Sequence, residues 1–154
     1  MNKMLSIAAF CLSATVLSAS VQAADRGTKE EAVAMVNKAA ALIKSAGKEK
    51  AFAAIADPQN KEFHDRDLYV YVYDLNGVAL THGNNPKMVG KNLLEIKDQE
   101  GKSMIKEMVA VAKSPAGKGW VDFKWPNPVT KAVEAKSGYV TKVDDMLVGS
   151  GIYK

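Results

Sequence analysis

Cysteine is nearly absent from this chain, which has one among its 154 residues. That residue, Cys11, follows Phe10 in an N-terminal apolar stretch with no small-residue lipobox around it, so the rest of the chain has no thiol for a disulfide or a cysteine metal site. No Cys-x-x-Cys-His motif for haem attachment occurs either. The two histidines, His64 and His82, are too few and too far apart in sequence to suggest a zinc site. We therefore expect no cofactor and no metal.

Runs of like charge are also missing. The 21 basic and 17 acidic residues give a net charge of +4 and are spread along the chain. Charge so dispersed does not build the basic patch that nucleic-acid binding needs. After the N-terminal stretch, no apolar run approaches the roughly 20 residues of a membrane-spanning helix. We expect no nucleic-acid partner and no transmembrane segment in the mature chain.

The first 23 residues have the organisation of a secretory signal peptide. Lys3 gives a positive start, the run from Leu5 to Val21 carries no charge, and Val21 and Ala23 place small residues at positions −3 and −1. Serine and threonine make the run only weakly apolar, which argues against a retained anchor. We predict cleavage after Ala23, a periplasmic location, and one domain over residues 24–154.

A helix is predicted to begin after Thr28. Thr28 and Glu31 have the spacing of a capping box, and apolar residues then recur at helical intervals. The pattern extends past Gly47 until Asp57 and Pro58, where proline ends it. Either one unusually long helix forms, with part of its surface available for a homodimer, or two helices form with a break near Gly47.

A β-hairpin is predicted next. The segment Leu68–Tyr73 alternates aliphatic residues with tyrosines, Asn76 and Gly77 are turn residues, and Val78–His82 is the return strand. If Asn76 and Gly77 alone form the loop, Tyr71 lies opposite His82. If the loop is one residue longer, Tyr71 faces Thr81 and His82 turns to the other side. The sequence leaves both registers open.

The remaining pattern predicts a loop, a helix and three strands, with Asp144 and Asp145 in the last turn. The loop covers residues 83–92, the helix 102–113, and the strands lie near 121–125, 134–143 and 146–153. This order predicts an α+β fold, in which an antiparallel sheet of about five strands is backed by a long N-terminal helix and a second covering helix.

Three ordered motifs carry a resemblance to a known family. They are the stretch from His82 to Leu93 with Asn85, Pro86 and Gly90, the cluster Phe123, Trp125 and Pro126, and the closing run Gly149–Tyr153. In these motifs the chain resembles the single Cache domain family (type 2), the extracytoplasmic sensor modules of bacterial chemoreceptors and histidine kinases. The resemblance covers most of residues 28–154. It implies a PAS-like fold whose pocket binds small organic molecules, often carboxylates such as lactate, pyruvate or propionate.

The chain departs from the family pattern in two places. Gly83 stands where the family usually has proline after the histidine, which loosens the entry to the loop. The sequence also stops at Lys154 without a second membrane span or a signalling domain. We therefore expect an exported, soluble sensor or binding protein that has no signalling output of its own and reports through a partner such as a membrane sensor protein.

A small carboxylate needs hydrogen-bond donors and a cation in an otherwise apolar pocket. Candidate ligand-binding residues with hydroxyl, imidazole or aromatic side chains are Tyr71, His82, Phe123, Trp125 and Tyr139. The cation is not located, although Lys136 and Lys142 lie near Tyr139 and Lys142 should face away from it. Glycines 149 and 151, on either side of Ser150, either let backbone amides approach a ligand or permit a bulge, and the bulge is the expected outcome.

The two other classes of function are an enzyme and a protein-interaction module. No nucleophile-elbow pattern brings Ser137 or Ser150 to a histidine, so we expect no enzyme. The alternative is a protein-interaction module that uses the same fold without a small ligand, either to dock on a membrane sensor or to form a dimer.

Overall fold

The computed structural model describes residues 26–154, so the predicted signal peptide lies outside the described part of the chain. A five-stranded antiparallel sheet has the strand order β4-β3-β7-β6-β5, and β1 and β2 form a separate two-stranded sheet. None of the helices described is long and apolar enough to cross a membrane. The elements are α1 (Lys29–Ala46), α2 (Lys48–Ala56), β1 (His64–Asp65), β2 (Leu68–Tyr69), β3 (Tyr71–Asp74), β4 (Ala79–His82), the short 3-10 helix η1 (Pro86–Met88), α3 (Met104–Lys113), β5 (Lys118–Pro126), β6 (Val133–Val143) and β7 (Met146–Tyr153).

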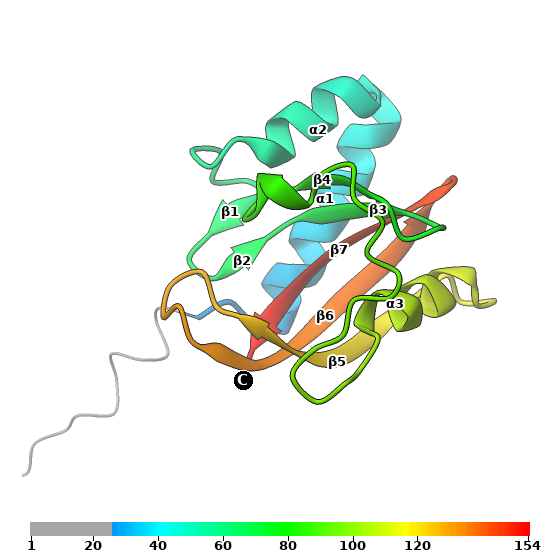
Figure 1. The fold of residues 1–154 in the computed structure, drawn as a ribbon. Helices are drawn as coiled ribbons and strands as arrows, with labels where there is room; N and C mark the ends of the chain where they lie inside the picture. The colour runs from blue at the N-terminus through cyan, green and yellow to red at the C-terminus, as the bar shows by residue number, and fades with distance from the viewer. Residues whose placement is uncertain (1–25) are drawn as a thin grey trace, which may run out of the picture.

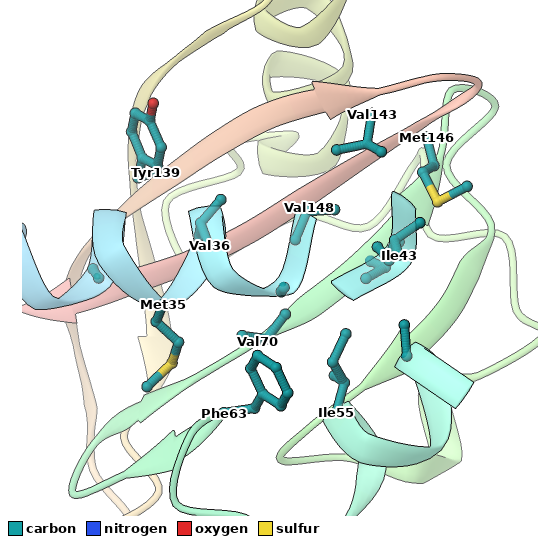
Figure 2. Close-up of a cluster of buried hydrophobic side chains, with 14 of the residues drawn as sticks. Met35, Val36, Ile43, Ile55, Phe63, Val70, Tyr139, Val143, Met146 and Val148 are labelled. Carbon is teal, nitrogen blue, oxygen red and sulfur yellow. The ribbon is translucent and has the colours of Figure 1, made fainter. Parts of the chain in front are cut away.

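Both faces of the large sheet are covered, so the strands have two different buried surfaces (Figure 1). On the α1 face, α1 and α2 pack on Val70, Val72 and Val148, and Figure 2 shows this cluster. On the α3 face, α3 packs on an apolar and aromatic cluster that includes Tyr71 and Val140. The predicted α+β architecture, with a five-stranded sheet and covering helices, is confirmed.

The N-terminal helical region consists of two helices. Thr28 caps α1 with the predicted capping box, in which its hydroxyl accepts from the Glu31 N–H at 3.2 Å and the Glu31 carboxylate accepts from the Thr28 N–H at 2.8 Å. Gly47 separates α1 from α2, and its φ of 84° lies in the left-handed region that glycine adopts without strain. After the break, α1 packs on β6 and β7 while α2 packs on β4.

The predicted hairpin forms, and it combines the two registers that the sequence left open. Near the turn, Tyr73 pairs with Ala79, which is the register of the longer loop. Leu80 is then bulged out, and Tyr71 pairs with His82 as in the shorter loop. The bulge therefore restores the alternation that brings His82 to the side of Tyr71.

The loop after β4 is held along the hairpin by backbone hydrogen bonds. The Gly90 N–H donates to the Ala79 carbonyl at 2.8 Å, and the Ala79 N–H donates to the Lys91 carbonyl at 3.0 Å. Leu93 is tied to the Gly77 carbonyl at 2.8 Å. This part of the His82–Leu93 motif thus fixes the loop beside the edge of the sheet.

The capping box predicts a measurable contribution to stability. Replacing Thr28 with Ala removes a side-chain acceptor at the start of α1 and should lower the free energy of unfolding by about 1 kcal/mol. Ser103 is the matched control, because it caps α3 without any side-chain hydrogen bond. Ser103→Ala should leave the urea midpoint nearly unchanged, and equal losses in the two variants would contradict this account.

Candidate functional site

A small cavity lies on the α3 face of the sheet. The space left between its side chains is about 20 Å³, and a single water needs roughly 10–15 Å³. The walls combine aromatic and apolar groups with one histidine and one lysine. We call this the tyrosine cavity, and its lining residues are Tyr69, Tyr71, Tyr73, His82, Met104, Ile105, Phe123, Trp125 and Lys136.

Lys136 brings a cationic group to the tyrosine cavity. Its side chain is 1% exposed, and its Nζ lies 3.9 Å from the centre of the Tyr69 ring and 4.5 Å from that of Tyr153. The amine donates a hydrogen bond to the Tyr153 hydroxyl at 3.2 Å, and this hydroxyl donates to the Pro126 carbonyl at 2.8 Å. Burial lowers the pKa of Lys136 to about 7, against a smaller opposing effect of the nearby Asp67 carboxylate.

His82 faces the tyrosine cavity as a neutral hydrogen-bond donor. Its Nδ1 accepts from the backbone N–H groups of Asn84 at 3.2 Å and Asn85 at 3.0 Å, so the ring proton resides on Nε2. Burial, assisted by repulsion from Lys136, lowers the pKa of His82 to about 4. The Gly83 N–H donates to the Val70 carbonyl at 2.8 Å, a bond that the proline usual in the family cannot make.

Tyr71 places a buried hydroxyl at the floor of the tyrosine cavity. The side chain is 3% exposed, and its hydroxyl has no hydrogen-bond partner among the residues described. The ring lies flat on the sheet because Gly149 and Gly138 leave room for it: a Cβ at Gly149 would overlap the ring, and one at Gly138 would come within 2.7 Å of the hydroxyl. An unpaired buried hydroxyl is unfavourable, so this oxygen is available to a ligand.

The glycines in β7 leave room for neighbouring groups, and the prediction of a bulge around Ser150 is wrong. The pairing of β6 with β7 runs without interruption from Lys136 and Tyr153 to the turn. Gly149 accommodates the Tyr71 ring, and a Cβ at Gly151 would lie 2.5 Å from the Ser137 carbonyl oxygen and 3.0 Å from Cε of Lys136. Close packing against the Tyr71 ring and against the backbone of β6 therefore accounts for the two glycines.

Asp67 connects the surroundings of Lys136 to the beginning of α1. The side chain is 1% exposed, and its Oδ1 accepts from the Gly27 N–H at 2.7 Å, while Oδ2 has no partner among the described residues. Burial raises the pKa of Asp67, and attraction from Arg26 and Lys136 partly offsets this effect. Asp67 thus supplies a buried acceptor at the start of the helix and a negative charge near the cavity.

Four of the five residues proposed from the sequence line this one cavity: Tyr71, His82, Phe123 and Trp125. The structure does not bring Tyr139 to them. Tyr139 lies in the cluster on the α1 face, where its ring packs 5.3 Å from that of Trp120 (Figure 2). Successive residues of β6 point to opposite faces, so Lys136 and Tyr139 lie on different sides of the sheet.

Lys136 is the functional candidate that the sequence analysis did not place. In the structure it pairs directly with Phe123 across β5 and β6, and both side chains point to the α3 face. The alternation in the sequence contains this signal, since Lys136, Gly138 and Val140 share one face of the strand. Assigning Lys136 to the cavity requires the pairing register of β5 and β6, which no turn motif specifies.

A larger and more open hollow lies on the other side of the molecule, between α1 and Trp120. It is bordered by exposed side chains including Lys29, Glu30 and Asn37. No buried polar side chain belongs to its lining in the described chain. The tyrosine cavity, with its buried amine, imidazole and hydroxyl, is therefore the candidate site.

Characterised proteins with similar sequences are bacterial receptors. The chain is 34% identical over 92 residues to the methyl-accepting chemotaxis protein McpP of Pseudomonas putida and, equally, to the sensor histidine kinase MctS of Rhizobium johnstonii. The aligned region is 58% of this chain but only 17% of McpP and 20% of MctS. The similarity therefore concerns one part of each receptor.

Solved structures with the same fold are sensor domains. A methyl-accepting chemotaxis protein of Vibrio parahaemolyticus has a TM-score of 0.70 and 26% identity, over 81% of this chain and 87% of the other. A Cache chemosensory domain, studied for its recognition of carboxylic acids, has a TM-score of 0.68 and 28% identity, over 80% and 91% of the two chains. The sequence model of the family called Single Cache domain 2 matches residues 15–154. Together with the fold, this match shows that the chain belongs to the single Cache domain 2 family of ligand-binding sensor domains.

Proposed function

We propose that this protein is a periplasmic sensor domain that binds a short organic carboxylate in the tyrosine cavity and catalyses no reaction on it. The observation that carries the proposal is the buried amine of Lys136, which faces the cavity without an ion pair to any carboxylate of residues 26–154. Cache domains of this family are ligand-binding modules, and one structural relative recognises carboxylic acids. Communication of the bound state to a membrane sensor protein is part of the same proposal.

The polar end of the tyrosine cavity has the groups that a carboxylate requires. Lys136 supplies the positive charge, His82 donates from Nε2, and the unpaired hydroxyl of Tyr71 can donate a third hydrogen bond. In a buried site, hydrogen bonds to a charged group contribute about 1.5–3 kcal/mol each. These three donors therefore provide the binding energy and orient the ligand.

The apolar end of the cavity limits the length of the ligand. Met104 and Ile105 come from α3, and Phe123 and Trp125 come from β5. The volume of about 20 Å³ has room for little more than one water, so a carboxylate of two or three carbons must displace side chains at its border, and a longer chain must displace more of α3. We expect acetate and propionate to bind more tightly than hexanoate.

Thermal unfolding of the chain from Ala24, in the presence of short carboxylates, amino acids and amines, tests the proposal. A ligand at about 100 times its dissociation constant should stabilise the fold by about 2.7 kcal/mol. A shift of the unfolding temperature with short carboxylates alone supports the proposed function. No shift with any compound would instead favour the protein-interaction alternative.

Tyr71→Phe separates the hydroxyl of Tyr71 from its ring. Without ligand, the variant should be as stable as the parent or slightly more stable, because an unpaired buried hydroxyl is removed. With propionate, the affinity should fall by about tenfold or more, since a hydrogen bond to the carboxylate is lost. Isothermal titration calorimetry measures this change. Tyr139→Phe is the control on the opposite face, and an equal loss of affinity in this variant would contradict the proposed site.

Lys136→Met should stabilise the fold and abolish binding. A buried charge that is kept for function lowers the stability of the fold. Replacing it with an apolar group of similar size therefore raises the free energy of unfolding, by roughly 1–4 kcal/mol. The gain should be larger near pH 6 than near pH 9, because Lys136 is charged in the fold only below its lowered pKa of about 7. Denaturant unfolding at the two pH values measures the difference. Lys142→Met, at an exposed position of β6, is the control and should change little.

A further inference from the structure

We propose that the tyrosine cavity takes up a proton together with its carboxylate, so that the protein responds to the organic acid and not to the anion alone. This inference rests on the proposed function, because the proton binds to Lys136 in the same cavity as the proposed carboxylate. It follows from the contacts around the Lys136 amine.

The amine of Lys136 is held by neutral groups. Two tyrosine ring faces and one hydroxyl oxygen are its contacts, at 3.9, 4.5 and 3.2 Å. Among residues 26–154, no ion pair within 4.0 Å involves Lys136. A buried ammonium without a paired anion is unfavourable, so the neutral amine becomes accessible near neutral pH.

The groups that face Lys136 from the surrounding elements do not neutralise it by direct contact. Asp67, which precedes β2, attracts the amine from beyond ion-pair distance and is itself bound to the Gly27 N–H. The segments β5 and α3 contribute only apolar and aromatic residues to the cavity. The other titratable groups around the cavity are Tyr69 on β2, Tyr71 and Tyr73 on β3, His82 on β4 and Tyr153 on β7.

These other groups keep one protonation state around neutral pH. Burial raises the pKa values of the tyrosines that surround the amine, so they stay neutral. His82 stays neutral because its Nδ1 accepts two backbone hydrogen bonds and its pKa is about 4. A short carboxylic acid, with a pKa near 4.3 like that of glutamate, is already an anion. Among the residues that line the cavity, Lys136 is therefore the group whose protonation changes near neutral pH.

Binding of a carboxylate shifts the protonation equilibrium of Lys136 from the neutral amine toward the ammonium. The ligand supplies the missing negative charge, which favours the ammonium form, and one proton enters with each anion bound to the neutral amine. The affinity for the anion should then be nearly constant below neutral pH. Above about pH 7, it should fall by up to tenfold per pH unit.

Calorimetric titration of propionate, at each pH in two buffers that are effective there and differ in ionisation enthalpy, measures this proton. The two buffers release protons with different heats, so uptake of a proton makes the apparent binding enthalpies differ. At about pH 8.5 we expect nearly one proton per propionate, and at about pH 5.8 nearly none. Identical enthalpies in both buffers at both pH values, with clear binding, would overturn this inference and leave the proposed function intact. No binding of propionate, acetate, lactate or pyruvate at either pH would overturn both.

A second measurement follows Lys136 without any ligand. In protein labelled with carbon-13 at lysine Cε, the signal of Lys136 is identified by its loss in Lys136→Met. We expect a titration midpoint near pH 7 that rises by about 2.5 units or more when propionate is added. A midpoint at the ordinary lysine value of about 10.4 in the free protein would overturn the inference. Lys142, exposed on the same strand, is the internal control, and its signal should not respond to propionate.

Discussion

The burial of one primary amine beneath α3 is the constraint on which the site depends. Taking an ammonium out of water is strongly unfavourable, and two aromatic faces with a single hydroxyl compensate for only part of the loss. The fold therefore holds Lys136 at the expense of stability, as functional sites commonly do. Because the amine is confined between Tyr69 and Tyr153, it has few alternative positions. In the proposed function, a ligand would meet a preorganised charge, and little ordering entropy would be lost on binding.

The arrangement of glycines makes this burial possible. Gly138, Gly149 and Gly151 lie on the α3 face of β6 and β7, where a side chain would collide with Tyr71 or, at Gly151, with the backbone of β6 and then with Lys136. Glycine within strands normally weakens a sheet, because it has no side chain to pack and loses much backbone entropy. Here the large aromatic ring and the long lysine side chain fill that space. The closing Gly149–Tyr153 motif is therefore as much a part of the cavity as the residues that line it.

Much of the fold could be predicted from local patterns, and the site only in part. The capping box at Thr28, the alternation in Leu68–Tyr73 and the turn at Asp144 are short-range signals, and they specify elements directly. Tyr71, His82, Phe123 and Trp125 were singled out by residue type and family motif, and they line one cavity. The positions of Lys136 and Tyr139 could not be predicted in this way, because they depend on which side of β6 faces α1 and which side faces α3. That property depends on pairing with distant strands, which the local sequence of β6 does not encode.

The bulge at Leu80 has a consequence for how the hairpin can vary in evolution. The turn from Asp74 to Val78 is one residue longer than the tightest hairpin, and the bulge absorbs this extra residue before the strand reaches His82. The ten residues between Tyr71 and His82 would equally fit an uninterrupted ladder closed by Asn76 and Gly77 alone, which also leaves Tyr71 opposite His82. The tip of the hairpin can thus exchange a longer turn and a bulge for a tight turn without altering the pairing beside the tyrosine cavity. Homologues that lack the bulge are expected to retain the same pair across a two-residue turn.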